Sequence, residues 1–159
     1  MNETKKSPLY FANLNSDKRI NINQGGTSSG KTFSILDVLF TLGASKENQV
    51  ITVVGQDIPN LKKGAYRDAK HIWGSSKIYQ QYWNKLNETD RIFTSITGSV
   101  IEFTSYSDEQ DAKSGKRDYL FMNEANGIDY NIYWQLAIRT RKKIFIDYNP
   151  TARFWVHDK

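Results

Sequence analysis

The chain has 159 residues, of which 38% are apolar and 13% aromatic, so it is long enough and apolar enough to bury one sizeable core. It contains no cysteine, which excludes disulfides and thiolate chemistry, and no apolar run near the roughly 20 residues that a membrane-spanning helix needs. The formal net charge of +5 permits contact with nucleic acid but does not require it.

The N-terminus is polar, contains Pro8 and lacks the apolar segment of a signal peptide. We expect residues 1–17 to form an N-terminal arm and residues 18–159 to form one domain. Residues 18–23 alternate polar and apolar side chains, which is typical of a short strand.

Helices and strands then alternate along the chain. Residues 32–44 carry apolar side chains at helical spacing, with Gly43 as the expected stop, and residues 58–74 repeat this pattern up to Gly74. Between them, residues 49–55 are β-branched and apolar, which indicates a buried strand.

The second half continues the alternation. Residues 91–105 form two alternating runs around a Thr-Gly-Ser turn, which predicts a hairpin. Residues 118–123 and 142–150 indicate buried strands, and residues 129–140 indicate a helix between them. The order of elements predicts an α/β fold with a mainly parallel sheet flanked by helices, the hairpin being inserted or at an edge.

A glycine-rich run separates the first strand from the first helix. Gly25, four further residues and then Gly30-Lys31-Thr32 match the phosphate-loop (P-loop) pattern G-x-x-x-x-G-K-[ST]. Its backbone N–H groups and the positive helix N-terminus favour an anion, whereas an incidental Gly/Ser loop is the alternative. Lys31 would reach the β- and γ-phosphates of ATP, and Thr32 would ligate Mg²⁺. The expected nucleotide contacts are Gln24, Gly25, Gly26, Thr27, Ser28, Ser29, Gly30, Lys31 and Thr32.

Hydrolysis also needs a group that orients or deprotonates water. Asn123 and Glu124 follow an apolar strand, at the sheet edge where ligands of open α/β folds bind. Glu124 is therefore the expected catalytic carboxylate, and a capping or surface role is the alternative. Asn123 is the expected second metal residue, although an amide lacks the charge of the usual aspartate and should hold Mg²⁺ less tightly.

A third polar group ends the last strand. Asp147, Asn149 and Thr151 are the expected sensors of the γ-phosphate, with Asn149 first, and Asp147 could also approach the metal or water. A simple strand-ending turn explains the Asn-Pro pair equally well.

These residues together resemble the ATPase domain of the large terminase subunit, the motor that packages DNA into tailed-phage and herpesvirus capsids. The stretches that carry the resemblance are "NQGGTSSGKT", "VVGQDIPNLKKGAYRDAK", "ITGSVIEFTSYSDEQDAKSGKRDYLFMNEA" and "KKIFIDYNPT". The resemblance implies a P-loop NTPase fold with an additional strand and a catalytic glutamate. It places Lys31 and Thr32 on phosphate and magnesium, Glu124 on the catalytic glutamate, and residues 147–151 on the coupling segment.

The resemblance also implies ATP hydrolysis coupled to translocation of double-stranded DNA into a procapsid. The implied partners are the portal protein, the small terminase subunit and further copies in a ring, usually of five subunits. No membrane is involved, and the implied location is the cytoplasm of the infected bacterial host. Large terminases carry a nuclease domain after the motor, for which this chain has no room, so we expect no nuclease activity from it.

The sequence departs from the family inside the P-loop, where many members carry an arginine and residues 26–29 here are Gly-Thr-Ser-Ser. We therefore expect a basic finger from a neighbouring subunit, with Arg117 first. A solvated basic loop is the alternative. The other finger candidates are Lys113, Lys116, Arg139 and Arg141.

Other functions remain open at this point. A helicase-like nucleic-acid-dependent ATPase shares the fold and the glutamate, and a nucleotide-binding switch with little hydrolysis suits Asn123. A small-molecule kinase would need an arginine-bearing lid that residues 75–117 do not suggest.

The contacts with DNA and with the adenine base have several candidates. Phosphates of DNA could contact Lys62, Lys63, Arg67, Lys142 and Lys143. The adenine base could contact Tyr10, Phe11 or Gln24.

Overall fold

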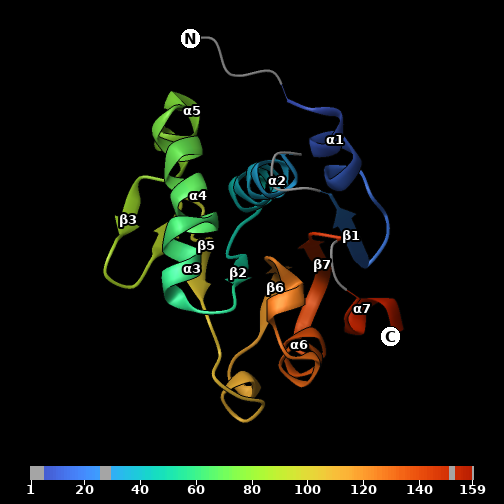
Figure 1. The fold of residues 1–159 in the computed structure, drawn as a ribbon. Coiled ribbons are helices and arrows are strands. Elements are labelled where there is room, and N and C mark those ends of the chain that lie inside the picture. Colours follow the sequence, from blue (N-terminus) through green and yellow to red (C-terminus); the bar gives the residue numbers. More distant parts are fainter. Residues whose placement is uncertain (1–5, 26–29, 151–152, 159) are drawn as a thin grey trace.

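A twisted sheet of seven strands forms the centre of the molecule (Figure 1), in a computed structural model that describes residues 6–25, 30–150 and 153–158. The strands are β1 (Ile20–Gln24), β2 (Val50–Val54), β3 (Lys85–Asn87), β4 (Ile92–Thr94), β5 (Val100–Thr104), β6 (Arg117–Met122) and β7 (Thr140–Tyr148). Their order is β1-β7-β6-β2-β5-β4-β3. The first five are parallel, and β4 and β3 continue the sheet antiparallel. The predicted mainly parallel α/β fold with an edge hairpin is confirmed.

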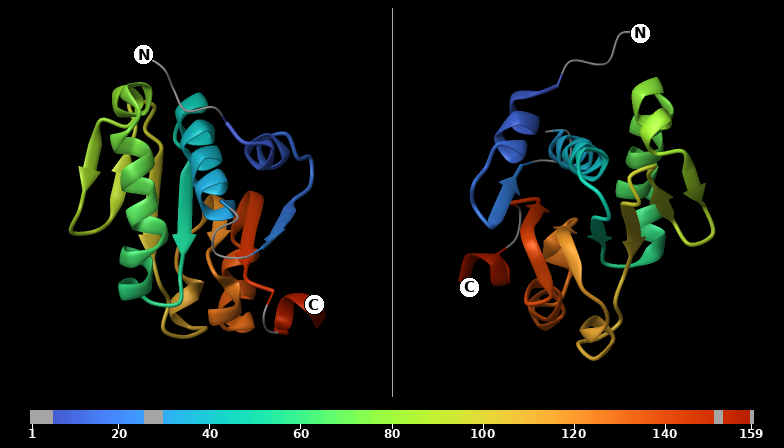
Figure 2. Two further views of the ribbon diagram at one scale, coloured as in Figure 1. Left: turned by 45° about the horizontal axis from the view of Figure 1, so that its top comes forward. Right: turned by 180° about the vertical axis from the view of Figure 1, so that it is seen from behind.

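Helices cover both faces of this sheet (Figure 2). They are α1 (Pro8–Leu14), α2 (Lys31–Ser45), α3 (Ile58–Lys63), α4 (Ala65–Gly74), α5 (Lys77–Tyr82), α6 (Tyr130–Ala137) and α7 (Trp155–Asp158), with 3-10 turns η1 (Asp111–Lys113) and η2 (Ala125–Gly127). One buried apolar cluster joins α1–α5 to the first face, and a second joins α6 to the other. Within the described part of the chain, none of these helices has both the length and the apolar character to cross a membrane.

The alternation of side chains along β6 and β7 decides which residues reach the α2 face. Phe121 and Phe145 belong to the cluster on the α2 side, whereas Leu120 belongs to the cluster on the α6 side. Successive strand residues point to opposite faces, so the next α2-side positions after the two phenylalanines are Asn123 and Asp147. Both therefore lie beneath the N-terminus of α2.

Several boundaries differ from the sequence prediction. Helix α2 continues through Gly43 to Ser45, because this glycine makes room for the ring of Trp83: a Cβ at Gly43 would lie 2.5 Å from it. The predicted helix over 58–74 is two helices that meet at Gly64, whose backbone lies outside the helical region. Helix α5 and strand β3 were not predicted.

The N-terminal segment is more than an arm between residues 7 and 14. Ser7 caps α1 and Pro8 starts it, and Tyr10 is 6% exposed against α2. The amide side chains of Asn13 and Asn23 donate to each other, at 3.0 Å in both directions. This buried pair joins α1 to β1 two residues before Gly25.

The amide pair gives a stability prediction. Asn13→Ala should leave the buried amide of Asn23 without a partner and lower the free energy of unfolding by about 1–3 kcal/mol, measured by urea denaturation. Asn15→Ala, an exposed residue just after the same helix, is the matched control and should change stability little. Equal stability of the Asn13→Ala variant and the parent would contradict a structural role for α1.

Candidate active site

The P-loop segment leads from β1 into α2. The Gly25 N–H donates to the Tyr148 carbonyl at 3.3 Å, which keeps the start of the loop beside β7. Gly30 has a φ of 76°, in the left-handed region that glycine adopts without strain, and is the N-cap of α2. Lys31, the first residue of α2, is 6% exposed. Gly26, Thr27, Ser28 and Ser29 lie outside the described residues.

Asp147 is the centre of the polar contacts at the C-terminal ends of β6 and β7. It is fully buried, and one of its oxygens accepts the Thr32 hydroxyl at 2.7 Å. The other accepts the backbone N–H of Glu124 at 2.6 Å, and the amide of Asn123 donates to the carboxylate at 3.2 Å. The structure thus brings together four residues that the sequence analysis had assigned to three separate roles.

Burial raises the pKa of the Asp147 carboxyl above its usual range. The N–H of Glu124, the Thr32 hydroxyl and the nearby ammonium of Lys31 act in the opposite direction by favouring the charged form. The anionic carboxylate therefore depends on the P-loop lysine and on the donors around it.

Glu124 lies two residues after the end of β6, and its backbone conformation is one that residues other than glycine rarely adopt. Its φ is 51° and its ψ is 58°, in the left-handed region, and the 3-10 turn η2 follows it. The side chain is exposed, at the same edge of the sheet as Thr32 and Asp147. A non-glycine residue held in this conformation is a feature that clusters at functional sites.

The oxygens of this cluster suit a magnesium ion. A hydroxyl and a carboxylate, from Thr32 and Asp147, are the kinds of ligand that Mg²⁺ prefers, with phosphates and water supplying the rest. Over residues 6–25, 30–150 and 153–158, no group of three or more His, Cys, Asp or Glu side chains could hold a metal alone.

The remaining predicted contacts lie around this centre. Gln24 ends β1, and its side-chain oxygen accepts the Tyr148 hydroxyl at 2.9 Å. Asn149 is half-buried just after β7, and Thr151 lies outside the described residues. Of the aromatic residues considered for the base, Tyr10 is buried, so it cannot stack on a nucleotide, whereas Phe11 is 48% exposed.

The prediction that Arg117 is the basic finger inserted into a neighbouring subunit is wrong. Its side chain is 2% exposed at the first residue of β6. The guanidinium donates to the Thr52 hydroxyl at 3.1 Å and to the carbonyls of Leu136 at 3.1 Å and Ser114 at 3.3 Å. A guanidinium enclosed by three acceptors cannot reach into another subunit.

The contacts of Arg117 predict a structural role instead. Arg117→Leu should remove three hydrogen bonds of a buried guanidinium and lower the free energy of unfolding by about 2–4 kcal/mol, measured by urea denaturation followed by circular dichroism. Lys116→Ala, at the exposed neighbouring position, should leave stability within about 0.5 kcal/mol of the parent. A stable Arg117→Leu variant that has lost only hydrolysis would restore the finger assignment.

The other finger candidates differ in accessibility. Lys113 and Lys116 are exposed in the turn before β6. Arg139 donates to a carbonyl of α6 at 2.9 Å, and Arg141 faces the buried carboxylate of Asp118 at 3.6 Å. Lys113, Lys116 and Arg141, whose side chain is 59% exposed, are therefore the candidates that extend into solvent.

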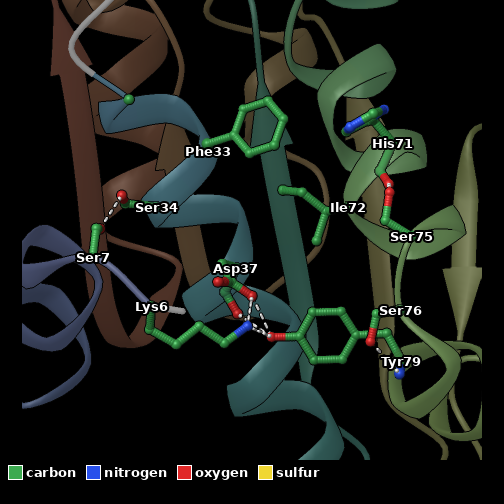
Figure 3. Close-up of a pocket in the computed structure, with 11 residues that line it drawn as sticks. Lys6, Ser7, Phe33, Ser34, Asp37, His71, Ile72, Ser75, Ser76 and Tyr79 are labelled. Carbon is green, nitrogen blue, oxygen red and sulfur yellow. Dashed lines mark hydrogen bonds and ion pairs between the residues drawn. The ribbon is translucent and has the colours of Figure 1, made fainter. Parts of the chain in front are cut away.

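A cavity of about 370 Å³ runs along α2, between the chain entering α1 and helices α4 and α5 (Figure 3). Among the described P-loop residues, Gly30 lines it. Lys6 Nζ lies 2.8 Å from the Asp37 carboxylate, to which the Tyr79 hydroxyl also donates. Burial raises the pKa of Tyr79 far above its usual value, so the phenol stays protonated. This trio joins the segment before α1 to α2 and α5.

The fold and the site define the class of protein. After a strand, a P-loop and a helix, the chain continues to β6, which Glu124 follows. Strand β7 lies between the P-loop strand and this glutamate strand. This is the arrangement of a P-loop NTPase with an additional strand. A sequence model described as "Phage terminase large subunit" matches residues 17–158, and the chain belongs to this family.

Solved structures agree with the class. The large terminase from a thermophilic bacteriophage matches with a TM-score of 0.75 and 20% identity, over 92% of this chain and 40% of that chain. The Thermus phage P74-26 large terminase ATPase domain matches with 0.70 and 11%, over 97% and 68%. The HK97 bacteriophage large terminase matches with 0.68 and 10%, over 91% and 33%.

This chain is shorter than the terminase chains that it matches. The chain spans about two fifths of the length of the first of these large terminases, which it covers to 40%. No curated protein gives a significant match to the sequence. At identities of 20% and below, the solved structures support the fold, and the residue roles depend on the geometry of this chain.

Proposed function

We propose that this chain is the ATP-hydrolysing motor domain of a phage DNA-packaging terminase. The observation that carries the proposal is the buried contact of Thr32 with Asp147, which also accepts the N–H of Glu124, because it joins the P-loop to the strand end that bears the glutamate. The large terminase that matches with 20% identity, and whose fold is similar, was also solved in complex with ADP and with ATP-γ-S. Both ligands support a nucleotide site here.

Each residue of the site has a proposed role in phosphoryl transfer. The P-loop from Gly25 to Thr32, with Gln24 beside it, would hold the phosphates, and Lys31 would balance their charge. Mg²⁺ would neutralise charge on the β- and γ-phosphates when bound. Glu124 would orient the attacking water and accept its proton. Asn149 and Thr151 would sense the γ-phosphate from the end of β7.

The packaging function supplies the proposed partners. Double-stranded DNA would be gripped through its phosphates, for which the exposed Lys62, Lys63 and Arg67 on α3 and α4 are candidates. The portal protein of the procapsid, the small terminase subunit and further copies in a ring complete the assembly, in the cytoplasm of the infected host. Lys113, Lys116 or Arg141 would be the finger that a neighbouring subunit receives.

The proposal is tested by ATP turnover of the full-length protein, alone, with double-stranded DNA, with empty procapsids, and with both. Stimulation by DNA and procapsid together is the expected result. Stimulation by single-stranded nucleic acid without procapsid would favour a helicase-like ATPase. Nucleotide binding without turnover under any condition would favour a nucleotide switch, which the neutral Asn123 would suit. DNA cutting by this chain with Mg²⁺ or Mn²⁺ would contradict the expected lack of nuclease activity.

A further inference from the structure

The metal site of a P-loop NTPase normally combines the P-loop threonine or serine with an aspartate at the end of the glutamate strand. In this chain that position is Asn123, which brings oxygen but no charge. The carboxylate that the site needs must therefore come from another element, unless the site binds Mg²⁺ more weakly.

The sheet order places Asp147 where such a carboxylate would be needed. Strand β7 lies directly between β1 and β6, and Asp147 pairs in register with Asn23, two residues before Gly25. Asp147 is thus one strand closer to the P-loop than Asn123, on the same face of the sheet. The side chains of both residues point beneath the first turn of α2.

The contacts of Asp147 match those of a metal-site aspartate. Its carboxylate accepts the hydroxyl of Thr32, the P-loop residue expected on Mg²⁺, at 2.7 Å. The amide of Asn123 donates to the same carboxylate at 3.2 Å, so one carboxylate and one carboxamide face each other across β6 and β7. A buried carboxylate is costly, and the donors around Asp147 and the nearby Lys31 ammonium hold it beside the phosphate loop, where a bound Mg²⁺ would stabilise its charge further.

We infer that Asp147 on β7 supplies the carboxylate of the magnesium site in place of the residue at position 123. The inference rests on the proposed nucleotide function and assigns Asp147 to metal binding rather than to γ-phosphate sensing. Asn123 is then a positioning residue that holds the Asp147 carboxylate toward Thr32.

The test measures metal binding, not turnover, in the full-length protein. Mn²⁺ is titrated into the ADP complex and followed by electron paramagnetic resonance, with a fluorescent ADP analogue reporting nucleotide affinity in EDTA. Asp147→Asn should weaken Mn²⁺ binding by about 10- to 100-fold. The exchanged variant Asn123→Asp/Asp147→Asn, which keeps one acid and one amide, should regain most of it.

Two further variants separate metal binding from folding. Asp118→Asn removes another buried carboxylate, which is 5% exposed at the N-terminal end of β6. This variant should leave Mn²⁺ affinity unchanged. Asn123→Asp alone should not tighten Mn²⁺ binding, because it removes the amide that positions the Asp147 carboxylate and places a second carboxylate against it. Thermal denaturation of each variant shows whether it is folded, and the Asn123→Asp result decides the question if Asp147→Asn unfolds.

The outcomes distinguish the inference from the proposed function. Mn²⁺ binding by Asp147→Asn at parental affinity, or clearly tighter binding by Asn123→Asp, would overturn the inference and leave the nucleotide site intact. Failure of the folded exchanged variant to regain Mn²⁺ affinity would also overturn it, because Asp147 would then act only as an anchor. Failure of the parent protein to bind the ADP analogue would instead overturn the proposed function.

Discussion

Glu124→Gln is expected to reduce ATP turnover by about 10²- to 10⁴-fold while nucleotide affinity stays unchanged, because the amide cannot accept a proton from the attacking water. The substitution keeps the size of the side chain, and the backbone N–H that donates to Asp147 is retained. The measurements are steady-state phosphate release by the full-length protein with DNA and procapsid, and binding of a fluorescent ATP analogue.

Glu47→Gln is the matched control for the loss of one carboxylate. Glu47 is exposed in the loop before β2, at the N-terminal end of that strand and away from Glu124, so turnover should not change. Glu124→Gln turnover at the level of this control would show that Glu124 is a surface or capping residue. A parallel loss of nucleotide binding would show that the glutamate supports the loop rather than the chemistry.

Lys31→Ala is expected to weaken nucleotide binding at least about tenfold, since charge-assisted hydrogen bonds contribute about 1.5–3 kcal/mol each. Lys31 is buried to 6% exposure at the first turn of α2, and its ammonium also favours the charged form of Asp147. Equilibrium titration with a fluorescent ATP analogue measures the change.

The control for Lys31 lies at the other end of the same helix. Lys46→Ala removes an exposed ammonium next to the C-terminus of α2 and should leave nucleotide affinity at the parental value. Unchanged affinity of Lys31→Ala would show that the glycine-rich run is an ordinary loop, and the hydrolytic site would fail with it.

Most of the fold could be predicted because its central elements carry strong local patterns. The apolar runs of β2 and β6, and the glycine run between β1 and α2, each show a period or a spacing that allows few other structures. Helices α1 and α5 escaped prediction because short helices depend on tertiary packing more than on their own sequence. Gly43 was misread because a close contact with Trp83, distant in sequence, cannot be seen locally.

The candidate site could be predicted in its composition but not in its contacts. Lys31, Thr32 and Glu124 follow from motif spacing, and Asp147 was recognised as a polar strand end. Its bond to Thr32 depends on the strand order, in which the last strand of the chain inserts between the first and the sixth. Arg117 was misplaced because a run of basic residues usually faces water, whereas here one member of the run turns inward to Thr52 and two carbonyls.

The left-handed backbone of Glu124 has a consequence for how this residue is aimed. A side chain other than glycine pays about 1–2 kcal/mol for that conformation, and the 2.6 Å bond from its N–H to Asp147 opposes the cost. The direction of the glutamate is thus set by a strained turn that a neighbouring strand holds in place. Because Asp147 lies on β7, the direction of Glu124 depends on the pairing of β6 with β7 as well as on its own turn.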